Sequence, residues 1–308
     1  MRFAFIGFGE VAASFAAALA ARGAQVAAYD VLLERNGGAE SLRARAAGAA
    51  VAFSGLREAI AGSSYVFSTV TTTVAKDAAR ECAAYLAPGQ TYVDLNATEP
   101  SVKIEIGRIV SPTGAAFVEG AVLGAVGVTG ARTEILFGGA EGERAARELS
   151  GEFGLNVRFY SKEIGKASTF KMLRSVFSKG MEALLLEFLA AGERAGIRED
   201  LWREATELFS ANSFEKVAAN WVVSHATAHE RRYHEMEQVS GVLRALGVEP
   251  VMTGATEALF RRSVDLRLKE AFAAKPDSMD KVVKAFEERL RAGGKAVRGT
   301  KNRKVKAR

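Results

Sequence analysis

The sequence predicts an α/β fold, a doubly wound parallel sheet that is followed by an all-α domain. Three observations lead to this prediction: a glycine turn joins a strand to a helix within residues 3–30, strand and helix patterns alternate to about residue 160, and helical patterns alone follow. The expected divisions are a first domain over 1–162, a helical domain over 163–293 and a basic, disordered tail over 294–308.

The individual elements follow from periodicity. Short apolar runs suit buried strands, and apolar residues that recur every three or four positions suit helices. Strands are expected at 3–6, just before 30, and at 51–53, 64–70, 91–95, 115–122, 134–138 and 156–160. Helices are expected at 10–22, 39–47, 74–86, 99–110, 142–153, 166–196, 199–210, 213–224, 228–246, 253–269 and 278–292.

The glycine turn after the first strand has the pattern GxGxxA. Gly7 permits the tight turn, Gly9 lets the backbone approach a pyrophosphate, and Ala12 allows close packing of the helix on the strand. The helix that follows presents free N–H groups and its positive dipole end to phosphates. Asp30, at the end of the second strand, can accept hydrogen bonds from ribose hydroxyls. This context predicts a dinucleotide-binding Rossmann domain.

Composition limits the class of protein. The chain is 48% hydrophobic and 25% charged, and no uncharged apolar run approaches the length of about 18 residues that a membrane span requires. The first strand begins directly after Met1 and Arg2, so a signal peptide is not expected. The lone Cys82 cannot form an internal disulfide. We therefore expect a cytoplasmic protein in which Cys82 is a buried structural thiol.

The basic charge is concentrated at the C-terminus. Residues 291–308 hold eight Lys or Arg and no acid, which exceeds the net charge of +6, so the rest of the chain is slightly acidic. Such a tail is usually solvated and disordered. No aromatic residues are interleaved with base-reading side chains, so specific nucleic-acid binding is not expected.

The chain resembles the β-hydroxyacid dehydrogenases, the superfamily of 3-hydroxyisobutyrate and 6-phosphogluconate dehydrogenases, over about residues 1–270, and four stretches carry the resemblance. The first stretch is IGFGEVA at 6–12 with the YD at 29–30, and the second is DLNATEP at 94–100, which is similar to the family's D-x-S-T-x-x-P turn. The third is FVEGAVLGAVGVTGARTEILFGG at 117–139, which is similar to the D-A-P-V-S-G-G substrate motif. The fourth is GKASTFKM at 165–172, which is similar to the G-x-x-x-K-L helix that supplies the family's lysine. The pattern KMLRS at 171–175, followed by GMEALLLE at 180–187, resembles a poorly characterised branch of the superfamily that has a phosphogluconate-dehydrogenase-like C-terminal domain.

The resemblance implies that Lys171 is the catalytic residue. Such a lysine accepts the hydroxyl proton as hydride leaves the carbon, and it returns the proton in reduction. Burial and a cationic neighbour would bring its pKa toward neutrality. Arg174, three residues on and therefore on the same helix face, is expected to be that neighbour. The alternative is a solvated lysine on an exposed face.

Departures from the family pattern concern the substrate. Arg174 and Ser175 replace two asparagines that follow the lysine, and Ser175 is expected to orient substrate with a shorter reach. Leu123 replaces a serine that helps to hold a carboxylate, while Gly124 and Ala125 keep backbone amides available. Leu123 is expected to make the pocket more apolar. Arg174 is either the residue that recognises an anion by bidentate contact or one half of a structural salt bridge.

The cofactor is expected to be NAD rather than NADP, because Asp30 favours a free 2′-hydroxyl and repels a 2′-phosphate. The family's loop beneath the cofactor implies that Thr71 and Asn96 are contacts; alternatively, Thr71 begins a helix and Asn96 caps a turn. The expected cofactor-binding residues are Gly7, Phe8, Gly9, Glu10, Val11, Asp30, Val70, Thr71 and Asn96.

The histidines do not indicate a metal site. His225 and His229 share a helix face, but Ala226 stands where HExxH requires glutamate, and no acidic or cysteine cluster completes a zinc set. His234 lies where the superfamily carries a Lys-Asp-Leu near cofactor and substrate, so it either lines the nicotinamide pocket or is a surface residue in a polar run.

The sequence thus predicts an NAD(P)-dependent oxidoreductase that transfers a hydride between nicotinamide and the alcohol carbon of a hydroxy acid, with Lys171 as general acid and base. Two alternatives stay open: an imine reductase-like enzyme and a non-catalytic NAD(P)-binding protein. The expected partners are a small-molecule substrate and a second copy of the chain. Apolar residues around most of helix 166–196 indicate a helix-bundle core, a homodimer interface or both.

Overall fold

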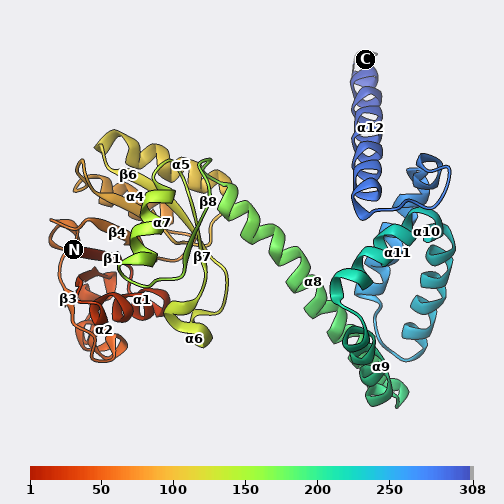
Figure 1. Ribbon diagram of the computed structural model, residues 1–308, viewed down its shortest axis with the longest axis horizontal. Coiled ribbons are helices and arrows are strands. Elements are labelled where there is room, and N and C mark those ends of the chain that lie inside the picture. Colours follow the sequence, from red (N-terminus) through yellow and green to blue (C-terminus); the bar gives the residue numbers. More distant parts are fainter. Residues whose placement is uncertain (306–308) are drawn as a thin grey trace. The chain divides into compact units, whose positions relative to one another are not determined.

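The computed structural model describes the backbone of residues 1–305 and the side chains of residues 1–292. The chain forms two compact units, Met1–Phe177 and the residues from Ser178 onward. The first contains a sheet with its covering helices, and the second is all-helical, so the predicted fold class is confirmed (Figure 1). The division falls within the long helix α8 (Lys166–Ala195), whose first turns belong to the first unit.

The first unit is built on one eight-stranded sheet with the order β3-β2-β1-β4-β5-β6-β7-β8. Its strands are β1 (Arg2–Ile6), β2 (Gln25–Tyr29), β3 (Val51–Phe53), β4 (Tyr65–Ser68), β5 (Thr91–Asp94), β6 (Ala116–Val122), β7 (Ile135–Gly138) and β8 (Val157–Ser161). All neighbours are parallel except β6 and β7. The strand order reverses between β1 and β4, which is where α/β sheets bind ligands.

Helices cover both faces of this sheet, as the alternation predicts. They are α1 (Glu10–Ala21), α2 (Gly38–Ala46), α3 (Leu56–Ile60), α4 (Ala75–Ala83), α5 (Pro100–Val110), the short α6 (Val126–Thr129) and α7 (Gly142–Gly151). Alternate residues of β1 enter different cores: Phe3 and Phe5 pack with α1 and α7, whereas Ala4 and Ile6 pack with α4 and α5. Cys82 is fully buried in the second core, as expected for a structural thiol.

The second unit contains the rest of α8, then α9 (Arg198–Ala211), α10 (Phe214–Ala245), α11 (Val251–Asp265), a short 3-10 turn η4 (Leu268–Ala271) and α12 (Met279–Val305). The two helices expected at 213–224 and 228–246 are one continuous helix, because neither glycine nor proline interrupts the chain between them. No helix within residues 1–305 has the length and apolar character needed to cross a membrane.

The basic C-terminal segment differs from its expected form. We expected 294–308 to be a disordered tail, but α12 continues through Val305. Gly293, Gly294 and Gly299 are poor helix formers, so this part of α12 extends the helix already nucleated at Met279 rather than following from its own propensity. Residues 306–308 lie outside the described part of the chain.

Candidate active site

The glycine turn has the geometry that its sequence requires. Gly7 has a φ of +84°, and a Cβ there would lie 2.9 Å from both Thr69 O and Val70 Cγ1. The Thr69 hydroxyl donates to Gly7 O at 2.6 Å and so ties the end of β4 to the turn. Gly9 is the N-cap of α1, makes no side-chain cap bond and has open space beside its Cα. The first-turn N–H groups of α1 are therefore available to an anion.

Asp30 holds the same turn from the end of β2. Its Oδ2 accepts the Phe8 N–H at 2.7 Å, and its Oδ1 accepts the Leu32 N–H at 2.9 Å. The Phe8 ring is fully buried and its N–H donates to Asp30, so its place among the cofactor contacts remains a prediction. Arg45, which our sequence reasoning missed, donates to Phe8 O at 2.8 Å and adds a cation beside this end of the site. The uncapped helix, the open Gly9 and the partly buried carboxylate of Asp30 fit a dinucleotide.

A cavity of about 340 Å³ lies at the carboxyl edge of the sheet, entirely within the first unit. Eight of the predicted site residues line it: Glu10, Val11, Val70, Thr71, Asn96, Gly124, Ala125 and Lys171. A second cavity of about 230 Å³ shares Asn96, Ala97 and Lys171 with the first and adds Ser175. Lys171 therefore lies in the wall of both cavities. Leu123 lines neither cavity.

Lys171 lies in the second turn of α8 and is half-buried. Burial lowers the pKa of its amine, and the charge of Lys103 lowers it further. The expectation that Arg174 is the cationic neighbour is wrong. The guanidinium of Arg174 instead turns toward the loop after β6, where its Nη1 donates to Leu123 O at 3.3 Å.

Lys103 is a buried cation that the sequence analysis did not single out. Only 1% of its surface is exposed, and its Nζ lies 2.9 Å from Asp94 Oδ2 in an ion pair. The same Nζ donates to Asp94 O at 2.8 Å and to Gly120 O at 3.3 Å. A signal was present in the sequence, because Lys103 shares a helix face with the apolar Ile106 and Val110.

Asn96 continues this network toward the cavities. Its Nδ2 donates to Asp94 Oδ1 and, at 2.9 Å, to Ser68 Oγ. A carboxylate accepts but cannot donate, so this contact fixes which side of the amide carries the nitrogen. Asn96 thus lies in both cavity walls with a fixed orientation. Thr71 does not begin a helix, since α4 starts at Ala75.

Glu119 fixes the start of the lysine helix and was also missed. This carboxylate is fully buried on β6, where Oε1 accepts the N–H groups of Gly165 at 2.7 Å and Ala167 at 3.0 Å, and Oε2 accepts the Ser168 hydroxyl at 2.8 Å. Gly138, opposite it on β7, leaves the necessary room, because a Cβ there would lie 2.5 Å from Oε1. A lone acid in an apolar strand is the signal that could have revealed it.

Some of the residues predicted to bind substrate line a cavity, and others do not. The Leu123 side chain packs against a small cluster with Ala121, Leu136 and Ala167 instead of making the cavity more apolar. Gly124 and Ala125 line the larger cavity. The Ser175 hydroxyl donates to Lys171 O at 3.1 Å, one turn back along α8.

The histidines belong to the second unit. His234 is exposed on α10, and its Nδ1 lies 2.8 Å from Glu237 Oε2, so its place near nicotinamide remains a prediction. Within the described residues, no group of three or more His, Cys, Asp or Glu side chains is arranged to hold a metal ion.

Comparisons with known proteins agree with this geometry. Residues 2–149 match the NAD binding domain of 6-phosphogluconate dehydrogenase, and residues 193–263 match a domain of unknown function, DUF1932. A conserved protein of unknown function, whose structure is described as similar to 3-hydroxyacid dehydrogenases, is 33% identical over 87% of this chain and 99% of its own, with a TM-score of 0.59. The chain belongs to this 6-phosphogluconate dehydrogenase-like family of NAD-binding proteins.

Other similar structures extend the picture of the family. A conserved hypothetical protein from Sinorhizobium meliloti is 30% identical and covers 94% of this chain and 96% of its own, with a TM-score of 0.60. An imine reductase from Myxococcus stipitatus has a TM-score of 0.73 over 92% of this chain and 98% of its own, but at 16% identity it shows the shared fold alone.

Replacing Lys103 with methionine should raise the pKa of Lys171, because the buried cation no longer opposes protonation of the amine. The pKa is measured from the pH dependence of Lys171 acylation, read by peptide mass spectrometry. Arg174→Ala is the matched control and should leave the pKa unchanged.

The single change leaves Asp94 buried without its partner, which typically costs about 3–5 kcal/mol of stability. Lys103→Met combined with Asp94→Asn avoids that unpaired charge and should show a smaller upward shift, because the negative charge of Asp94, which favours the protonated amine, is removed as well. A shift in Arg174→Ala and none in either Lys103 variant would contradict the assignment.

Proposed function

We propose that this protein is an NAD(P)-dependent oxidoreductase that acts on the alcohol carbon of a hydroxy acid, with Lys171 as general acid and base. The observation that carries the proposal is the position of Lys171: a half-buried amine with a lowered pKa, in the wall of both cavities at the carboxyl edge of a dinucleotide-binding sheet. Nicotinamide, when bound, supplies or accepts the hydride.

Lys171 can accept and return the proton of the substrate hydroxyl. A lowered pKa increases the fraction of Lys171 that is neutral near pH 7, and a neutral amine can accept the proton of a substrate hydroxyl. Because Lys171 is only half-buried, the proton can pass to water afterwards. In reduction the ammonium form donates the proton to the forming alkoxide. Glu119 keeps this amine in place by fixing the start of α8.

Anion recognition is assigned to Arg174. No carboxylate lies within ion-pair distance of Arg174 in the described part of the chain, so the alternative of a structural salt bridge is not observed. Its guanidinium lies beside the loop that carries Gly124 and Ala125, whose amides donate to no protein acceptor among the described residues. A substrate carboxylate could use both the arginine and this backbone.

Imine reduction is a second candidate. The chain lacks the serine hydroxyl that helps to hold a carboxylate in the family, and several solved structures that share its fold are imine reductases. A panel of hydroxy acids, sugar acids and imines, followed at the nicotinamide absorbance, separates the two reactions. A response to neither class would leave the non-catalytic NAD(P)-binding alternative.

The proposed working form is a homodimer in the reducing cytoplasm, where a lone thiol such as Cys82 persists. The exposed apolar side chains of α8 support the dimer, since Leu173, Val176 and Leu186 are 64%, 71% and 67% exposed. Leu173 and Val176, one turn apart on α8, form an exposed apolar patch of the kind that marks an association interface.

Lys171→Ala should lower kcat for alcohol oxidation by about 10²- to 10⁴-fold, the usual contribution of a positioned acid–base group. The dissociation constant of NADH, measured by nicotinamide fluorescence, should stay within about twofold, because it does not depend on proton transfer. Lys166→Ala, on the same helix and exposed, is the control. Full activity in Lys171→Ala would disprove the assigned role.

We expect NADH to bind more tightly than NADPH, because the Asp30 carboxylate repels a 2′-phosphate. Asp30→Asn keeps an oxygen for the Phe8 N–H and removes the charge, so it should reduce the preference about tenfold or more. The two dissociation constants are compared by fluorescence titration. Tighter NADPH binding in the unaltered protein would refute the preference.

Arg174→Ala should raise KM for an acidic substrate by about tenfold or more, because a charge-assisted hydrogen bond is lost. The KM for NAD should not change. The matched control is the neutral amide of the same substrate, whose KM should be insensitive to the variant. An unchanged KM for the acid removes Arg174 from anion recognition.

A further inference from the structure

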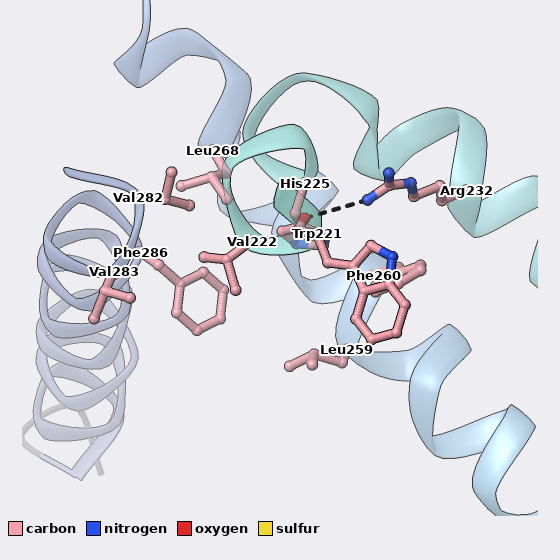
Figure 2. A pocket seen from close by; sticks show the side chains of 10 residues that line it. All are labelled: Trp221, Val222, His225, Arg232, Leu259, Phe260, Leu268, Val282, Val283 and Phe286. Carbon is pink, nitrogen blue, oxygen red and sulfur yellow. Dashed lines mark hydrogen bonds between the residues drawn. The ribbon is translucent and has the colours of Figure 1, made fainter. Parts of the chain in front are cut away.

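The second unit contains an apolar cavity that the proposed reaction does not use. Its volume is about 600 Å³, and its walls come from α10, α11, η4 and α12 (Figure 2). The lining side chains are Trp221, Val222, His225, Arg232, Leu259, Phe260, Leu268, Val282, Val283 and Phe286. This volume and this composition, mainly aromatic and aliphatic with a few polar groups, are those of small-molecule sites.

The cavity is partly open to solvent. Leu268 and Val282 are buried at its base, whereas Trp221, Leu259 and Val283 are 45%, 50% and 54% exposed. The helices around it pack on one another, since α10 contacts α11, η4 and α12. The concavity is therefore held by packed helices, and an apolar ligand could cover side chains that are otherwise in water.

Arg232 supplies the one cation in the wall. Its guanidinium donates to Ser224 Oγ at 2.8 Å and to Trp221 O at 3.4 Å, both neutral acceptors. Figure 2 shows it at the edge of the cavity, beside Trp221. In the described part of the chain no carboxylate forms an ion pair with Arg232. Most of its five N–H donors thus remain available for an anion.

His225 adds no charge to the cavity. Its Nε2 lies 2.8 Å from Ser263 Oγ, and Ser263 is fully buried. Burial, with help from the nearby charges of His229 and Arg232, lowers the pKa of His225 to about 4. The imidazole is therefore neutral near pH 7, and Arg232 alone determines the charge that a ligand should carry.

We propose that this cavity binds an amphipathic monocarboxylate, with its alkyl or aromatic body among the apolar side chains and its carboxylate on Arg232. An unpaired arginine at the edge of an apolar cavity complements an anionic head on an apolar body. A neutral apolar molecule would leave the guanidinium without a charged partner, and a cation would be repelled. The proposal does not depend on the reaction at Lys171.

Decanoate is the probe, and Trp221 is the reporter. The chain has two tryptophans, and Trp202 on α9 is not in the cavity wall. Trp202→Phe therefore leaves Trp221 as the one tryptophan, whose fluorescence should change in a saturable way as decanoate is added to the full-length chain below its micelle concentration. Decanol is the neutral counterpart and should bind about tenfold or more weakly, because it lacks a charge-assisted contact.

Arg232→Gln, in the same background, should reduce decanoate binding about tenfold or more and leave decanol binding unchanged. Arg232→Lys should restore part of the loss. The matched control is Arg231→Gln, since Arg231 precedes it on α10, is exposed and pairs with Glu235. Val283→Glu, at an exposed position of the rim, should repel decanoate and keep the fold, which thermal unfolding checks.

Other outcomes overturn the proposal. Equal binding of decanoate and decanol, or tight decanoate binding by Arg232→Gln, would show that Arg232 does not recognise a carboxylate. If no saturable change occurs and Val283→Glu converts a dimer into a monomer by light scattering, a second copy of the chain fills the cavity instead. No saturable change with an unaltered mass would show that this class of ligand does not bind.

Discussion

The candidate active site depends on the hydrogen bonds between the buried carboxylate of Glu119 and the start of α8. This carboxylate lies on β6, inside the sheet, and receives two backbone N–H groups and one hydroxyl from the start of α8. A negative charge at a helix N-terminus is favourable, and here it is buried, where its hydrogen bonds are least exposed to competition from water. Because a helix is stiff, fixing its first turn also fixes Lys171 one to two turns later. The sheet therefore positions the amine directly.

Burial lowers the pKa of that amine, and a second buried charge lowers it further. The ion pair between Lys103 and Asp94 is neutral as a whole, but its positive end opposes protonation of Lys171. The negative partner, Asp94, accepts hydrogen bonds from the backbone and side-chain amides of Asn96. One buried pair thus lowers the pKa of the Lys171 amine and orients the Asn96 amide in the cavity wall. Such a pair adds little to stability compared with apolar packing, so its use here is better understood as an arrangement of charge for the site.

A feature could be predicted from the sequence where it depends on neighbouring residues, and could not where it depends on contacts between distant elements. The glycine turn, the strands and the helices could be predicted because they depend on local patterns. Lys103 and Glu119 stand out in the sequence only as charges within apolar patterns, and their roles could not be assigned, since their partners lie on other elements. Arg174 shows the same limit: its spacing indicated the correct helix face, but the side chain is long and turns to Leu123 O instead of approaching Lys171.

Asp30 has two tasks, and this has a consequence for how cofactor use can evolve in this chain. The carboxylate that we propose to disfavour a 2′-phosphate also accepts the Phe8 N–H that shapes the glycine turn. A mutation to a small apolar residue would relax selection against a 2′-phosphate and loosen the turn in the same step. Lineages that switch to NADP are therefore expected to pass through asparagine or serine at this position, which keep an acceptor oxygen, before Arg45 or a new cation is recruited. The shared hydrogen bond restricts the order in which such mutations can be accepted.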